Sequence, residues 1–221
     1  NWKALEKSPR KLRIGLMLDA GSGQKVEKDV REIAVKAAKA FESAGAVITE
    51  IDGILTPEML EGLDNFWRAR TWDELSKLSE ADRGKTLPYI LNWAEAGAKL
   101  SGVDVVRGFN QTMAIRAAAA KLFCEVDYVI SPVSPVVNFP AEFASPLNDP
   151  AKPFEHICFT VPWNMSENPA LSINGGYDKK GFPIGVQIIG RRFDDIGVLG
   201  MGKAFEGLRG PQKPWPTPPK K

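Results

Sequence analysis

The sequence predicts an α/β protein in which a mixed, twisted sheet is flanked by helices. Short apolar runs alternate with segments of helical periodicity, as is typical of that class. Residues 11–20 form an apolar run that ends at the Gly-rich loop GSGQK. Residues 26–44 then carry apolar side chains at spacings of three and four, and residues 46–51 form a second apolar run. This order predicts a β-α-β unit with parallel strands.

The remaining elements follow from the same two periodicities. Residues 57–125 have a helical pattern throughout, and their alanine run AIRAAAAKLF favours a helix packed closely against its neighbours. One face of that helix carries Val103, Val106, Asn110, Met113, Ala117 and Ala120. The aromatic residues Phe66, Trp67, Trp72 and Trp93 recur at helical spacing, which favours the core over a ligand cage. Strands are expected near 12–18, 46–51, 128–131, 170–174 and 184–189.

Proline and glycine mark the connections. Six prolines between residues 132 and 153 predict a long extended loop, which in a compact domain is usually functional or disordered. Asp194 and Asp195 resemble a catalytic carboxylate pair, but a helix that begins there explains them by capping. The Pro-rich tail, residues 211–221, is expected to be extended and exposed. Residues 1–221 are thus expected to form a single α/β domain, or a fragment of one.

Composition excludes several classes of protein. The 221 residues include 29 Lys and Arg against 27 Asp and Glu, a balance that gives no electrostatic reason to bind nucleic acid. No run approaches the roughly 20 apolar residues of a membrane span, and the charged first residues are unlike a signal peptide. Cys124 and Cys158 stand in apolar surroundings and are predicted to be buried free thiols, which fits a cytoplasmic protein.

The residues by themselves do not make a complete active site. The one histidine, His156, has no second histidine with which to hold zinc, and no Gly-x-Ser-x-Gly elbow or P-loop occurs. Ser22 has Lys25 close by, but nothing in the sequence places that pair in a pocket. The GSG loop lacks the third glycine of a dinucleotide fingerprint, so a tight turn is the better interpretation. No metal or organic cofactor is expected.

Two long motifs resemble the amidase signature family. YVISPVSPVVNFPA is similar to the strand and proline-rich loop of that family, and FTVPWNMSENPALSINGGYDKKGFPIGVQIIG is similar to its "F-T-x-P-x-N-x-x-G-x-P-A" and "G-x-P-x-G-x-Q-x-x-G" patterns. The helix start at Phe193 to Asp195 continues the resemblance. Glu167 stands where the family often has Gly, and Asn174 where it often has Pro.

The resemblance implies the C-terminal half of an amidase. The family hydrolyses carboxylic amides with a Ser nucleophile, a second Ser in a cis peptide and a Lys, which lie upstream of the β-α-β unit that opens this chain. None of the three can be carried over, so this chain alone is predicted to be inactive. The implied partners are a small amide substrate and the N-terminal catalytic half. A wall facing that half is expected to contain Ser134, His156, Phe159, Thr160, Trp163 and Asn164.

Two other functions remain open at this point. The first is the A-type component of a glutamine-dependent tRNA amidotransferase, although His156 and Ile157 stand where such enzymes place an acidic residue for the glutamine amino group. The second is a non-catalytic α/β binding domain. Loss of sheet neighbours also predicts self-association as a homo-oligomer, or retention of the other half, unless the sheet edge is capped.

Overall fold

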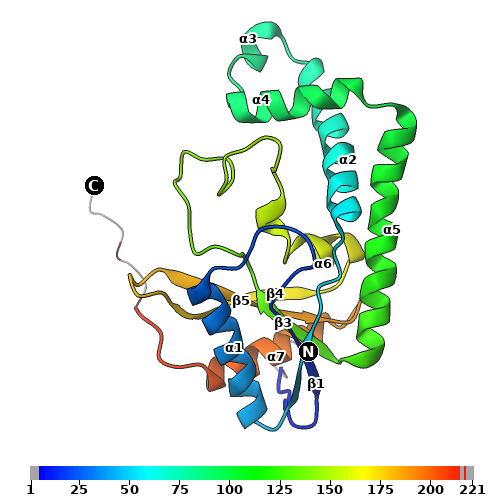
Figure 1. Ribbon diagram of the computed structural model, residues 1–221. Coiled ribbons are helices and arrows are strands. Elements are labelled where there is room, and N and C mark those ends of the chain that lie inside the picture. The colour runs from blue at the N-terminus through cyan, green and yellow to red at the C-terminus, as the bar shows by residue number, and fades with distance from the viewer. Residues whose placement is uncertain (1–4, 215–216, 218–221) are drawn as a thin grey trace.

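A five-stranded mixed sheet forms the centre of the chain (Figure 1), described by a computed structural model for residues 5–214 and 217. The strand order is β2-β1-β3-β5-β4, with β1 parallel to both β2 and β3, and β5 antiparallel to both β3 and β4. The strands are β1 (Arg13–Met17), β2 (Val47–Ile51), β3 (Tyr128–Pro132), β4 (Ala170–Tyr177) and β5 (Pro183–Gly190). The predicted mixed sheet and its parallel β-α-β unit are therefore confirmed.

Helices occupy both faces of this sheet. They are α1 (Lys28–Ser43), α2 (Pro57–Ser76), α3 (Glu80–Arg83), α4 (Pro88–Glu95), α5 (Gly102–Glu125), α6 (Val161–Ser166) and α7 (Asp195–Leu208), with short 3-10 turns η1 (Ala96–Lys99) and η2 (Glu155–Ile157). The helical prediction for residues 57–125 holds, since α2 to α5 fill that range.

One core lies between the sheet and the pair α1 and α7. Ile14 and Leu16 of β1 point into it, and the rings of Phe41 and Phe205 stack at 5.5 Å between the two helices. A second core lies on the opposite face, where Met17 meets side chains from α2, α5 and α6. The alternation along β1 follows from the two-residue period of a strand, and it makes the protein a three-layer α/β/α structure.

The long helix α5 carries the predicted stripe on one face, and that face is the outer one. Its buried residues are Gly108, Ile115, Ala119 and Phe123, which face α2 and α6. The predicted stripe that begins at Val103 lies on the other side and faces solvent. The apolar pattern correctly predicted a helix. Periodicity alone does not say which of two apolar faces of a helix is buried in the core.

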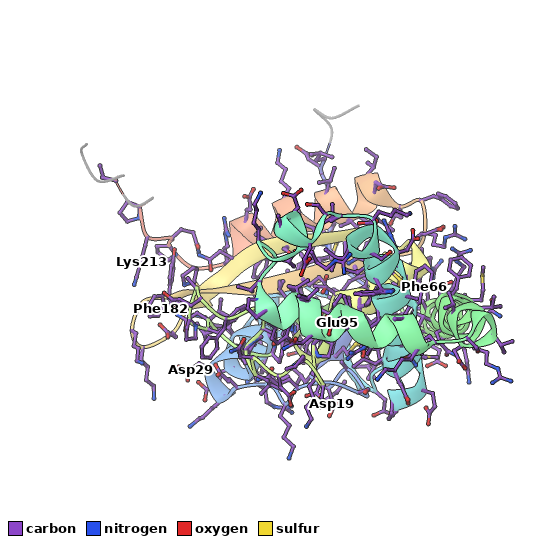
Figure 2. All side chains as sticks on the ribbon, turned by 90° about the horizontal axis from the view of Figure 1, so that it is seen from above. Asp19, Asp29, Phe66, Glu95, Phe182 and Lys213 are labelled. Atoms are coloured by element: carbon purple, nitrogen blue, oxygen red, sulfur yellow. The ribbon has the colours of Figure 1, made fainter. Side chains whose placement is uncertain are left out.

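Two smaller predictions also need correction or refinement. Cys124 is exposed, because it belongs to the outer side of α5, whereas Cys158 is buried as predicted. Among the four aromatics, Trp93 is buried in the core as predicted, and the other three are partly buried. Figure 2 shows Phe66 beside α5, where its ring lies 5.4 Å from that of Phe109.

The connections fit their sequence signals. Asp194 caps α7 by accepting a hydrogen bond from the Gly197 backbone N–H at 3.1 Å, so the capping explanation of the carboxylate pair holds. Gly21 has φ +89° and lies against the Leu55 carbonyl, which confirms a tight turn in the GSG loop. Residues 133–154 form neither helix nor strand. Residues 211–214 of the predicted tail are exposed, and most of the rest of that tail lies outside the described residues.

Candidate active-site wall

Five of the six predicted wall residues lie on one continuous segment, which runs from η2 through α6. His156 belongs to η2, Phe159 and Thr160 join the two helical turns, and Trp163 and Asn164 belong to α6. Pro162 occupies the first turn of α6, where a missing N–H costs nothing. The segment packs between α5 and the end of the sheet.

A buried glutamine attaches this segment to the sheet. Gln187 on β5 is only 3% exposed, and its side-chain amide donates to the Phe159 carbonyl at 2.7 Å and to the Ser131 hydroxyl at 3.2 Å. A buried amide bound to a backbone carbonyl holds that carbonyl in one position, because breaking the bond would leave two polar groups unpaired. Gln187 thus links β3, β5 and the wall segment.

The GSG loop holds the same segment from the other side. The Gln24 backbone N–H donates to the Glu155 carbonyl at 3.0 Å. Gly23 has φ +115°, and a Cβ there would come within 2.8 Å of that carbonyl. Only glycine allows this close approach. The turn therefore positions η2, which is a role that its sequence alone did not reveal.

Exposure divides the five residues into two groups. His156 and Thr160 are partly exposed and Asn164 is exposed, so their side chains are available to a neighbouring molecule or segment. Phe159 and Trp163 are each 1% exposed and belong to the core between the sheet and α5. The Trp163 ring packs edge-on against Phe123 at 6.1 Å. These two aromatic rings support the segment from behind.

His156 is the ionisable member of the group. Its ring lies edge-on to Phe139 of the proline-rich loop at 6.2 Å, and burial lowers its pKa while a backbone hydrogen bond with Pro153 opposes that change. Its Nδ1 atom is buried without a hydrogen-bond partner among the described residues. Burial therefore favours the neutral form of the imidazole, which lies edge-on to an apolar ring.

Ser134 lies apart from the other five. It lines a pocket of about 340 Å³ with Val136 of the same loop and with residues of the β4–β5 hairpin such as Ser172 and Ile173. Its hydroxyl accepts from the Val136 backbone N–H at 3.3 Å. The structure thus places Ser134 in a separate, largely apolar pocket at the sheet edge.

The part of the chain that the structure describes contains few groups suited to catalysis. Within residues 5–214 and 217, no group of three or more His, Cys, Asp and Glu residues could hold a metal ion, and no helix is long and apolar enough to cross a membrane. Burial raises the pKa of the Cys158 thiol to about 12, so it is a poor nucleophile. Ser22 lines a pocket of about 260 Å³ beside Glu61 and Asp64, and Lys25 is not among the residues lining it.

The sequence profile of a known family covers most of this chain. The Amidase family profile matches residues 2–199, which include the β-α-β unit, the whole wall segment and Gln187. The chain belongs to the amidase signature family. The resemblance inferred from the two long motifs is thereby confirmed, and it extends through the β-α-β unit and the helical region between the motifs.

Two curated proteins match most of the chain at moderate sequence identity. One is the A-type component of the glutamyl-tRNA(Gln) amidotransferase from Lachnospira eligens, which is 26% identical over 231 aligned positions that cover 94% of the chain and 47% of that protein. Another is the acylamidase of Rhodococcus erythropolis, which is 29% identical over 92% of the chain and 43% of the relative. The chain thus spans about half the length of the curated relatives it matches.

A solved amidase shares the fold. The crystal structure of a bacterial aryl acylamidase of the amidase signature family superposes with a TM-score of 0.80 at 22% identity, over 94% of this chain and 45% of that one. The likeness establishes that the five-stranded sheet and its helices are a portion of the amidase signature fold.

Proposed function

We propose that this chain is the C-terminal part of an amidase and supplies one wall of its substrate site. The observation that carries the proposal is the wall segment: a short stretch of family motif, held from both sides by Gln187 and Gly23, that presents His156, Thr160 and Asn164. Two independent anchors, at the Glu155 and Phe159 carbonyls, keep the polar side chains of this segment within a narrow range of positions, as a substrate wall requires.

The chemistry of the proposal is hydrolysis of an amide C–N bond. By family resemblance, a serine from the N-terminal half attacks the amide carbonyl, the amine leaves with a proton, and water then releases the acid from the acyl-enzyme. This chain contributes no nucleophile or base. Its wall residues bind and orient the acyl or amine group, and the proposal requires no metal or organic cofactor.

The six wall residues take different parts in this proposal. The Thr160 hydroxyl, which donates to the Ile157 carbonyl at 3.1 Å, can accept a hydrogen bond from the substrate, and Asn164 offers its amide. His156 offers an aromatic surface beside Phe139. Phe159 and Trp163 keep the segment in place through the core. Ser134 lies in its own pocket and would bind a more distant part of the substrate.

The first test is activity of the isolated chain. We expect no hydrolysis of simple aromatic or aliphatic amides above the buffer rate, because losing a whole nucleophile-and-base set costs many orders of magnitude. Turnover that survives purification and disappears in Ser22→Ala, Lys25→Ala or His156→Ala would show instead that the active site lies within these 221 residues.

The second test uses the full reading frame that contains this chain. Asn164→Ala is expected to lower kcat/KM on a preferred amide about 10-fold or more, because a hydrogen bond to substrate is lost, with the melting temperature unchanged. Asn92→Ala on α4 is the matched control, since Asn92 is also an exposed helical asparagine. Equal effects of the two changes on kcat/KM would mean that Asn164 does not contact the substrate.

Substrate class separates the amidase from the amidotransferase. The similarity to the Lachnospira eligens protein keeps glutamine in consideration. However, His156 and Ile157 offer no carboxylate for a glutamine amino group. We expect the full-length protein to release amine or ammonia from uncharged amides and to leave free glutamine intact. Ammonia release from glutamine would instead favour the amidotransferase.

A further inference from the structure

The outer side of α5 carries an uncovered stripe of small and apolar side chains. Val103 is 58%, Val106 59% and Met113 50% exposed, although all three lie on a well-formed helix of 24 residues. In Figure 1 this helix forms the margin of the molecule, with α2 on its inner side. The exposed members, here named the outer stripe, are Val103, Val106, Asn110, Met113, Ala117, Ala120 and Cys124.

The protein's own core does not account for the outer stripe. The opposite side of α5 already supplies Ile115 and Phe123 to the core formed with α2 and α6. An exposed helix needs one apolar face, whereas α5 has two. Contiguous exposed apolar surface of this kind marks an interaction site.

The spacing of the outer stripe indicates a helical partner. Its members follow one another at intervals of three, four, three, four, three and four residues, which is the a/d pattern of a coiled coil over three heptads. A straight helix drifts by only about 20° per heptad from this repeat, so the stripe remains on one side along its length. Asn110 falls at an a position, where a polar residue specifies register and oligomeric state.

The order of side-chain sizes identifies the partner helix. The larger residues, Val103 and Val106, lie in the first half of the stripe, and the small Ala117 and Ala120 lie in the second half. A two-fold axis that pairs α5 with an antiparallel copy brings each valine opposite an alanine: Val103 faces Ala120 and Val106 faces Ala117. Met113 then faces Asn110 at the centre. Large-on-small pairing fills such an interface, whereas parallel pairing would oppose valine to valine and alanine to alanine.

We propose that a second copy of this chain docks on the outer stripe, so that two α5 helices pair antiparallel about a two-fold axis near Gln111 and Thr112. Such an interface is isologous, as most homodimer interfaces are. The helix is about 36 Å long at 1.5 Å per residue, long enough for the six paired layers.

The charges beside the outer stripe are compatible with this arrangement. In the antiparallel pair Arg107 lies next to Ala114 of the other copy rather than next to a basic residue, and Lys121 lies near Asp104 of the other copy. Arg116 takes no part in this pairing, because its guanidinium forms an ion pair with Glu167 of its own chain at 2.6 Å. In a parallel pair, Lys121 and Asp104 of the other copy would instead lie about 25 Å apart along the axis, so this attraction would be lost.

Sedimentation velocity on the 221-residue chain tests the dimer. We expect a mass twice that of one chain at micromolar concentration. Val106→Glu places two carboxylates opposite alanine methyl groups and should weaken association on the order of 100-fold. Val47→Glu on β2 is the matched control, because Val47 is 56% exposed and lies on a different element. A wild-type chain that is monomeric at all concentrations, or equal weakening by both variants, would overturn the proposal.

Disulfide trapping tests the direction of the two helices. In a Cys124→Ser background, mixed Val103→Cys and Ala120→Cys chains should form a heterodimeric disulfide, and neither should cross-link with itself. In a parallel pair these positions are about 25 Å apart along the axis, and Val103→Cys would cross-link with itself. Self-cross-linking, or no cross-link in a chain that still sediments as a dimer, would rule out the antiparallel pairing. Circular dichroism of each variant confirms that the chain remains folded.

Discussion

Glu167 shows how one residue departs from its family and still suits its place. It follows α6 with φ +60° and ψ +34°, a left-handed conformation in which glycine is normally preferred. Its carboxylate forms ion pairs with Arg116, at 2.6 Å, and with Arg192. The backbone thus explains why the family often has Gly here, and the two arginines explain what this chain gains from Glu.

Substitutions at Glu167 should separate these two effects. Glu167→Ala loses the ion pairs and retains the strained backbone, whereas Glu167→Gly loses the same ion pairs and relieves the strain. We expect the Gly variant to be more stable than the Ala variant by about 1 kcal/mol, measured by urea denaturation. The half-exposed ion pairs themselves should contribute only about 1 kcal/mol or less each. Equal stability of the two variants would mean that the backbone is not strained.

The two cysteines should differ in reactivity. Cys124 is exposed, while Cys158 is fully buried and burial raises its pKa to about 12. Since the thiolate is the reacting form, Ellman's reagent should label one thiol per native chain and two after denaturation. Cys124→Ser should leave no reactive thiol in the native chain. Rapid labelling of Cys158 in that variant would show that the core around η2 opens readily.

At the scale of elements, one arginine joins two helices to the proline-rich loop. Arg68 on α2 is largely buried, and its guanidinium donates to the Asp64 carboxylate at 2.9 Å, to the Trp93 carbonyl on α4 at 2.9 Å and to the Pro150 carbonyl at 2.8 Å. The Trp93 indole N–H also donates to Asp64 at 2.7 Å. Burial raises the pKa of Asp64, and the hydrogen bonds from Trp93 and Arg68 oppose that rise.

Replacing Arg68 should release the loop. A lysine ammonium keeps the charge but cannot reproduce the planar fork, so Arg68→Lys should cost about 1–3 kcal/mol of unfolding free energy. Amide exchange in residues 140–154 should accelerate more than exchange in the sheet. Arg70→Lys is the control, because Arg70 is exposed and its ion pair with Glu74, at 3.8 Å, is weak. Equal acceleration of amide exchange in both variants would show that Arg68 does not hold the loop in place.

At the scale of the whole molecule, the chain has two complete cores, two edge strands and one uncovered helix face. The sheet is filled on both faces by helices, yet β2 and β4 are its edge strands among the described residues, and the outer stripe of α5 is uncovered as well. The chain spans about half of its relatives' length, so a further segment of the protein could pair with such an edge strand.

Interactions between residues close in sequence determine many features of this fold. The alternation of apolar runs with helical periodicity predicted all five strands to within a few residues, and the Asp194 cap and the glycine turn at Gly21 depended only on neighbouring residues. The wall segment could be proposed from the sequence because its motif is continuous. Such features are encoded within a few residues of where they act, so one sequence is enough to read them.

Only the tertiary structure decided which surfaces are covered. Helical periodicity placed Val103 and Met113 on one face of α5, but whether that face meets the core depends on α2 and α6, which are distant in sequence. The same holds for Trp163, whose burial depends on Phe123, and for Ser134, which lies in a pocket apart from the other wall residues. The sequence by itself determined the family, the strands and the turns. Burial is a relation between distant segments, and it exists only after the chain has folded.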